Sequence, residues 1–313
     1  MSTQTADNRI VVAGASGQIG RELVRELERG GRRVMRLVRR EPRSEDEARW
    51  DPNSRLLDPR LLDGAAAVVN LAGSRLSRLP WTYNVKKDIL RSRVNATLTI
   101  TEALERSIDP PAALLNASAT GVYGDRPDEE LDEGSGIASE GFLPRVVERW
   151  EAAARTAPQG VRVVLLRTGM VVGGEGGFVA VLKRLGQFGL LAKLGDGRQH
   201  WPWISMRDEV RAIVHLLDSG LRGPVNLVGP EPASAERLLQ ALADELGKPM
   251  RLSAPGQIID FTLREAGREL FLADQRILPR ALLDDGFRFR EGTAQQAVEL
   301  ALLELSKERR ANG

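Results

Sequence analysis

The sequence predicts an α/β fold, with a doubly wound parallel sheet and a smaller, mostly helical C-terminal lobe. Two observations predict the sheet. Strand-length apolar runs alternate with helical segments through the first two thirds of the 313 residues, and the first run leads directly into a glycine-rich turn and a helix. A third observation predicts the lobe, because the pattern becomes mostly helical from about residue 231 onward.

The first strand and helix enclose the most specific motif of the chain, Gly14-x-x-Gly17-x-x-Gly20. Glycines at this spacing let the backbone turn tightly, approach a pyrophosphate and pack the helix against the strand. Free N–H groups at the start of the helix then bind the phosphates, so the motif predicts a Rossmann-type dinucleotide site. The residues of this turn that we expect to contact the cofactor are Gly14, Ser16, Gly17, Gln18, Ile19 and Gly20.

The end of the second strand indicates which dinucleotide binds. Sites selective for NAD usually carry Asp or Glu here to bind the ribose hydroxyls, whereas NADP sites carry Arg, which pairs with the 2′-phosphate. Arg39 and Arg40 occupy this position, so we expect NADP(H), with Arg40 as the main phosphate ligand and Arg39 as the second. Glu41 follows closely enough to keep NAD open as an alternative.

Asp51 follows the third strand, directly after Trp50. Related folds use an Asp at this point to bind the amino group of the adenine, so we include Asp51 among the cofactor-binding residues. An Asp that opens the turn Asp51-Pro52-Asn53 would explain the same residue, because Asp side chains often accept hydrogen bonds from the backbone of a turn. Both interpretations stay open.

The remaining elements follow in order. Continuous apolar runs are typical of strands buried on both faces, and they cover residues 65–71, 112–118 and 161–167. A last strand is expected over 224–228. Helical spacing is seen over 18–29, 85–106, 144–157, 208–217, 233–246, 258–272, 278–283 and 293–309. Residues 194–204 look irregular and aromatic, and the run of glycines over 173–177 predicts a flexible loop.

These elements predict two parts of the chain. Residues 1–170 form a nucleotide-binding domain whose sheet is completed by about 205–230. Residues 171–204 and 231–313 form a substrate lobe that rests on the sheet.

Composition excludes several classes of function. Lys and Arg total 45 against 43 Asp and Glu, so the net charge of +2 does not indicate a nucleic-acid partner. Cysteine is absent and only His200 and His215 are present, which argues against a metal site or a Cys nucleophile. No apolar run approaches the roughly 20 residues of a membrane span, and residues 1–8 lack the apolar core of a secretory signal. We therefore expect a cytoplasmic enzyme or binding protein with a small-molecule ligand; the oligomeric state is left open.

With these segments assigned, the chain resembles the extended short-chain dehydrogenase/reductase superfamily. Within it, the chain is similar to the atypical branch called epimerase family protein, whose members carry a short C-terminal domain of their own. The motifs that carry the resemblance are the glycine turn, Val69-Asn-Leu-Ala-Gly73, Ser92-Arg93, Ser118-Ala-Thr-Gly-Val-Tyr-Gly124, Trp150-Glu151, Arg167-Thr-Gly169, Gly176-Gly177, Pro202-Trp203-Ile204 with Asp208, Gln275-Arg276, and Gly286-Phe287.

The resemblance implies further site residues. Leu71, Ala72 and Gly73 would border the ribose of the cofactor, and Arg93 and Arg167 would also belong to the cofactor site.

One departure from the superfamily concerns catalysis. Its usual catalysts place a Tyr and a Lys four residues apart on the helix after the fifth strand, where the Lys lowers the pKa of the Tyr. Here the Tyr position is Phe142 or Leu143 and the Lys position is Val146 or Val147, so the proton-transfer pair is missing.

Four residues are candidates to replace the missing pair: Ser118, Thr120, Tyr123 and His200. The first three lie at the carboxyl end of the fifth strand, where open α/β sheets bind ligands, although a Tyr here also serves packing. His200 lies in the aromatic loop, and a histidine side chain can serve as a general acid. Two functions stay open. One is an NADP(H)-dependent oxidoreductase or epimerase acting on a small polar metabolite. The other is an NADP(H)-binding protein without turnover that senses the cofactor for a partner.

Overall fold

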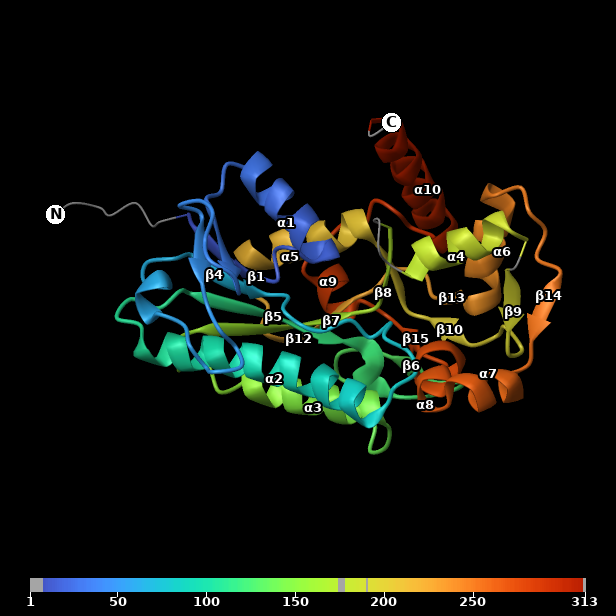
Figure 1. Cartoon of the computed structure of the whole chain (residues 1–313), viewed down its shortest axis with the longest axis horizontal. Coiled ribbons are helices and arrows are strands. Elements are labelled where there is room, and N and C mark those ends of the chain that lie inside the picture. The colour runs from blue at the N-terminus through green and yellow to red at the C-terminus, as the bar shows by residue number, and fades with distance from the viewer. Residues whose placement is uncertain (1–7, 174–177, 190, 312–313) are drawn as a thin grey trace.

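A seven-stranded parallel sheet forms the centre of the molecule (Figure 1). The computed structural model describes residues 8–173, 178–189 and 191–311. The strand order is β12-β7-β5-β4-β1-β2-β3, which reverses direction between β1 and β4 and confirms the doubly wound α/β fold. The strands are β1 (Ile10–Ala13), β2 (Val34–Val38), β3 (Glu47–Arg49), β4 (Ala67–Asn70), β5 (Ala113–Ala119), β7 (Arg162–Thr168) and β12 (Gly223–Leu227).

Helices cover both faces of this sheet (Figure 1). The helices are α1 (Gln18–Arg29) and α5 (Met206–Asp218) on one face, and α2 (Tyr83–Arg106) and α3 (Phe142–Ala154) on the other. Side chains alternate between the faces of a strand, so Ile10 and Val12 pack with α1 and α5, whereas Val11 and Ala13 pack with α2. Burial on both faces explains why these strands are continuous apolar runs.

A second layer of elements lies beyond the carboxyl ends of the strands (Figure 1). In its hydrophobic core, side chains of residues 235–243 and 294–302 pack with Trp201 and Trp203. The helices are α4 (Phe178–Gln187), α6 (Ala235–Glu245) and α10 (Ala294–Ala311). Short strand pairs complete this lobe: β8 (Met170–Val172) with β11 (Trp203–Ser205), β9 (Ala192–Leu194) with β14 (Leu252–Ala254), and β10 (His200–Trp201) with β13 (Ala233–Ser234).

Two sequence predictions about this lobe were wrong. The helix expected over 258–272 is broken at Arg264, whose φ of +52° lies in the left-handed region and cannot continue a helix. The loop expected over 194–204 contains β10 and β11, which pair with strands distant in sequence. The remaining elements are η1 (Pro59–Leu61), η2 (Thr120–Tyr123), β6 (Glu130–Leu131), α7 (Gly256–Leu263), α8 (Glu265–Gly267), η3 (Arg268–Leu272), β15 (Arg276–Ile277) and α9 (Arg280–Asp284).

In the described part of the chain, no helix combines the length and the hydropathy needed to cross a membrane.

Candidate functional site

A cavity of about 340 Å³ opens at the glycine turn, where the strand order reverses. Ligands of open α/β sheets bind at this kind of switch point. The residues that line the cavity come from the turn after β1, the end of β4 and strand β8; they are Gly14, Gly17, Gln18, Ile19, Gly20, Leu71, Met170 and Val171. The turn residues and Leu71 are among those predicted from the sequence, and the contribution of β8 is new.

The glycines of the turn are required by close backbone contacts. Gly14 has a φ of +81°, and a Cβ atom there would lie 2.6 Å from the carbonyl carbon of Leu71. A Cβ atom at Gly20 would overlap the carbonyl oxygen of Gly14. Gly17 caps α1 without a side-chain hydrogen bond, so the first N–H groups of the helix remain available to an anion. The side-chain amide of Gln18 donates to the carbonyl oxygen of Gly173 and ties the turn to the chain after β8.

The two arginines at the end of β2 differ in their surroundings. Arg40 donates to both carboxylate oxygens of Glu47, each at 2.7 Å, and to the carbonyl oxygen of Glu41 at 2.8 Å. The hydrogen bonds from Arg40 hold the pKa of Glu47 at about 2. Arg39 is exposed, and within the described residues its guanidinium makes no hydrogen bond or ion pair. Arg39 therefore offers the free positive charge, while Arg40 is held in place.

Asp51 closes the turn that follows β3. Its carboxylate accepts hydrogen bonds from the N–H of Asn53 at 2.9 Å and from the hydroxyl of Ser54 at 2.8 Å. These bonds lower the pKa of Asp51, with the Ser54 hydroxyl contributing most. The turn alternative accounts for these contacts, and adenine binding by Asp51 stays a prediction.

Several residues of the family motifs meet in a buried polar network between β5, β7 and α3. Glu151 accepts hydrogen bonds from Ser118 Oγ at 2.7 Å and from Arg167 Nε and Nη2 at 2.8 and 3.0 Å. Arg167 Nη1 donates to the hydroxyl of Tyr123 at 2.9 Å, and this hydroxyl donates to Asn226 Oδ1 at 2.7 Å. Tyr123 is fully buried, and this burial raises its pKa. The positions of Ser118, Tyr123 and Arg167 favour a structural role over contact with a ligand.

A second buried network holds the end of β4. Asn70 Nδ2 donates to Thr97 Oγ1 at 3.1 Å and to Asn116 Oδ1 at 2.7 Å, and Trp150 Nε1 donates to Thr97 Oγ1 at 3.0 Å. Asn70 Oδ1 accepts the N–H of Ala72 at 3.2 Å, which fixes the backbone just after the strand. This network explains why one polar residue, Asn70, stands in the apolar run of β4.

The position of the missing catalytic Tyr is covered by the C-terminal part of the chain. Phe142 and Leu143 are each only 7% exposed and pack in one cluster with Trp81 and Ala266. The carboxylate of Glu269 accepts the N–H groups of Phe142 and Leu143 at 2.7 and 2.6 Å, so it caps the start of α3. Apolar side chains and a capping carboxylate therefore occupy the region where the superfamily places its phenol.

Gln275 links the backbone of His200 to that of Thr120. His200 Nδ1 lies 2.9 Å from a carboxylate oxygen of Asp274, and the His200 ring is about one-third exposed. The next residue, Gln275, donates its backbone N–H to the His200 carbonyl, and its side-chain amide donates to the carbonyl oxygens of Thr120 and Gly124. Of the four predicted catalytic residues, His200 and Thr120 are therefore connected through Gln275 by their backbone carbonyl oxygens, while Ser118 and Tyr123 are engaged in the buried network.

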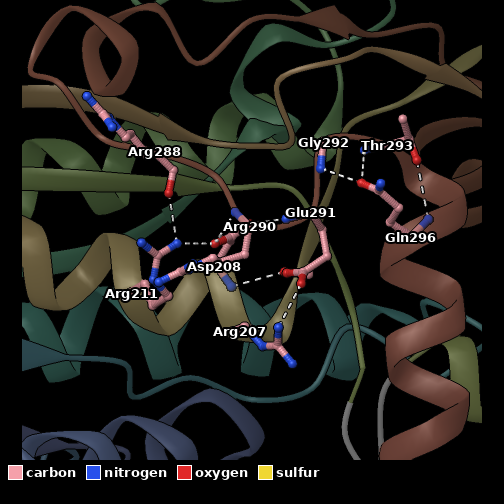
Figure 2. Close-up of polar contacts among 10 residues, drawn as sticks. Arg207, Asp208, Arg211, Arg288, Arg290, Glu291, Gly292, Thr293 and Gln296 are labelled. Atoms are coloured by element: carbon pink, nitrogen blue, oxygen red, sulfur yellow. Dashed lines mark hydrogen bonds and ion pairs between the residues drawn. The ribbon is translucent and has the colours of Figure 1, made fainter.

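The C-terminal segment is anchored on the start of α5 (Figure 2). The buried carboxylate of Asp208 accepts the N–H of Arg290 at 2.8 Å and that of Glu291 at 3.0 Å. The buried carboxylate of Glu291 in turn accepts hydrogen bonds from Ser205 Oγ at 2.7 Å and Arg207 Nη1 at 3.1 Å. These contacts fix the chain between α9 and α10 against the sheet domain.

Comparison with known families identifies the class of protein. Residues 10–229 match the NAD dependent epimerase/dehydratase family, and residues 254–301 match a domain of unknown function, DUF1731. The chain belongs to the NAD-dependent epimerase/dehydratase family and carries this second domain at its C-terminal end. Both findings confirm the resemblance drawn from the motifs. Two of the motif residues, Gly176 and Gly177, lie outside the described residues.

The similar proteins share nearly the whole length of the chain. Epimerase family protein Mb2239 of Mycobacterium bovis is 37% identical over 294 residues, which cover 93% of this chain and 97% of the relative. Epimerase family protein SDR39U1 of Bos taurus is 30% identical over 90% of this chain and 95% of its own. The structure of human epimerase family protein SDR39U1 with NADPH superposes with a TM-score of 0.85 at 27% identity, covering 94% of this chain and 98% of that one. The structure of MoeE5 in complex with UDP-glucose and NAD superposes with a TM-score of 0.75 at 25% identity. The match covers 96% of this chain and 99% of MoeE5.

Four partners in these sites were missed by sequence reasoning. Glu47 gave no local signal, because its place beside β2 depends on the pairing of β3 with β2. Asn226 had a usable signal, because it is a polar residue inside an apolar strand; in the structure its side chain is fully buried. Glu269 and Asp274 gave no signal, because their partners are more than 70 residues away along the chain.

Proposed function

We propose that this protein binds NADP(H) in the cavity at the glycine turn and uses it to oxidise, reduce or epimerise a small polar metabolite. The observation that carries the proposal is the fit of the cavity to a dinucleotide phosphate. The absence of a Cβ atom at Gly14 lets the turn pack closely against the backbone of Leu71 beside the cavity, and the uncapped start of α1 offers N–H groups. The human relative whose structure contains NADPH has the same fold along nearly its whole length, which supports the same cofactor here.

The residues of this chain that would hold the cofactor divide along its length. Arg39 and Arg40 would bind the 2′-phosphate, and Arg39 would contribute more because Glu47 already engages Arg40. The turn and the start of α1 would bind the pyrophosphate. Met170 and Val171 line the cavity from β8 and would pack against the cofactor. When bound, the nicotinamide supplies or accepts a hydride.

The proton transfer that accompanies a hydride needs a group other than Tyr and Lys. The hydroxyls of Ser118 and Tyr123 are committed within the buried network, whereas His200 is partly exposed and has Asp274 at its Nδ1 atom. A carboxylate at Nδ1 orients the ring and leaves Nε2 to hold or release a proton. We propose His200 as the acid–base group and the hydroxyl of Thr120, whose carbonyl oxygen is bound by the same Gln275 that contacts His200, as a hydrogen-bond donor to the substrate.

A test is NADPH oxidation by the full chain across a panel of aldehydes, ketones and nucleotide sugars, with epimerised products followed by NMR. Without the phenol we expect turnover about 10²- to 10⁴-fold below that of ordinary reductases. His200→Ala should lower it further. His215→Ala is the matched control, because His215 also pairs with a carboxylate, that of Asp285 at 2.7 Å, but lies on α5 beside the end of α9. Ordinary rates that His200→Ala leaves unchanged would contradict the proposal.

A second candidate function is an NADP(H)-binding protein without turnover. The capping of α3 by Glu269 and the burial of Phe142 and Leu143 favour it, because the C-terminal domain covers the region of the usual catalyst. This candidate predicts tight NADPH binding with no oxidation of any substrate in the panel and no effect of His200→Ala.

A further inference from the structure

The guanidinium of Arg93 carries a positive charge that the protein does not neutralise. Arg93 is half-buried on α2, and no carboxylate among the described residues forms a hydrogen bond or ion pair with it. Its Nη1 donates to the carbonyl oxygens of Ser74 and Ile89, each at 3.1 Å. These are its hydrogen bonds within the described part of the chain, so Nε and Nη2 keep their donors free.

The contacts of Arg93 hold its side chain in one orientation. The guanidinium carbon lies 5.1 Å from the ring centre of Trp150, whose indole N–H is itself fixed by Thr97. The Arg93 side chain also lies against Gly73, where a Cβ atom would come within 3.4–3.6 Å of it. Arg93 is therefore a preorganised cation, and its free donors Nε and Nη2 are not among the fully buried atoms.

Arg93 lies close to the cavity at the glycine turn. Gly73 is two residues beyond Leu71, which lines that cavity and contacts Gly14. Two residues of extended chain span about 7 Å, so the guanidinium is within reach of a ligand held at the turn. It also lies one helical turn from Ile89, which packs with Val146, one of the two residues that can correspond to the missing Lys.

We infer that Arg93 binds an anionic group, a carboxylate or a phosphate, of a ligand held at the carboxyl end of β4. Partly buried charges in proteins are usually paired, and the free Nε–Nη2 edge of a guanidinium matches two oxygens of such a group. Loss of solvation also lowers the pKa of Arg93 to about 10, as expected where no acidic neighbour compensates the charge. The inference deepens the proposed function, because the anion belongs either to the cofactor or to the substrate.

Calorimetry with Arg93→Gln distinguishes these two sources. The protein is titrated with NADPH and with 2′,5′-ADP, which lacks the nicotinamide-side phosphate. Oxalate and inorganic phosphate are then titrated with and without saturating NADP⁺. A cofactor phosphate at Arg93 predicts at least a tenfold loss of NADPH affinity with little change for 2′,5′-ADP. A substrate anion predicts unchanged NADPH affinity and at least a tenfold loss for oxalate or phosphate.

Matched variants keep the test decisive. Arg91→Gln removes an exposed charge from the same helix and should leave every affinity within about twofold. Arg93→Lys keeps the charge and most of the packing, and it should retain part of the affinity if Arg93→Gln is poorly folded. The inference is overturned if folded Arg93→Gln binds all four probes within twofold of the parent protein. Failure of the parent protein to bind NADPH would instead contradict the proposed function, and the anion titrations without NADP⁺ would still test Arg93.

Discussion

Replacing Glu151 by Gln tests the role assigned to the buried network. Glu151 and Arg167 are 2% and 3% exposed, and two hydrogen bonds of 2.8 and 3.0 Å join them. Glu151→Gln keeps the shape but removes the negative charge, which leaves the Arg167 guanidinium buried without a counter-charge. Breaking a buried pair in this way costs about 3–5 kcal/mol of the free energy of unfolding.

Urea unfolding at pH 7 measures this loss, and two further variants identify its cause. Glu148→Gln, at an exposed position of the same helix, should change the free energy of unfolding by no more than about 0.5 kcal/mol. The double variant Glu151→Leu with Arg167→Met should recover part of the loss, because no charge is left buried. NADPH affinity should stay the same in folded Glu151→Gln. A loss below about 1 kcal/mol, or a tenfold weaker affinity for NADPH, would refute a purely structural network.

Three other predictions follow from particular contacts. Arg39→Ala should weaken NADPH binding by about 1.5–3 kcal/mol and leave NADH unchanged, with a smaller effect of Arg40→Ala; calorimetry showing the reverse order would contradict the free charge assigned to Arg39. Asp208→Ala should lower the free energy of unfolding by about 1–3 kcal/mol, because the N–H groups of Arg290 and Glu291 lose their acceptor. The segment before α10 should then become sensitive to protease, and an unchanged digestion pattern would argue against this anchor. Burial raises the pKa of Glu209 to about 8, so the folded state binds one more proton than the unfolded state between about pH 4.5 and 8, and stability falls as the pH rises through this window. Glu209→Gln should flatten that fall in melting temperature measured from pH 4.5 to 8, and an unchanged slope would contradict it.

Much of the fold could be predicted from the sequence because its signals are local. The strand before Gly14 and the helix after it follow from hydrophobic periodicity, and the glycine spacing follows from backbone contacts that no side chain would permit. The break at Arg264 could not be predicted, because a left-handed residue that is not glycine leaves no mark in the periodicity.

The candidate site was only partly predictable, because motif residues look alike whether they bind ligand or hold the fold. Ser118, Tyr123 and Arg167 belong to family motifs, yet Glu151 and Asn226 use their polar atoms inside the protein. Arg40 shows the same limit, since its carboxylate partner lies on the next strand. Whether a polar residue faces a ligand depends on these distant partners, which only the folded chain brings together.

Titration of the full chain with NADPH and with NADH is the most direct test of the account. The uncapped start of α1 and the glycine turn should bind the part shared by both dinucleotides, and Arg39 should add a charge-assisted contact that only NADPH can make. We predict saturable binding of both cofactors with one site per chain, and a dissociation constant for NADPH at least tenfold lower than that for NADH. Equal affinities, tighter binding of NADH, or no binding of either cofactor would contradict an NADP(H) site at the glycine turn.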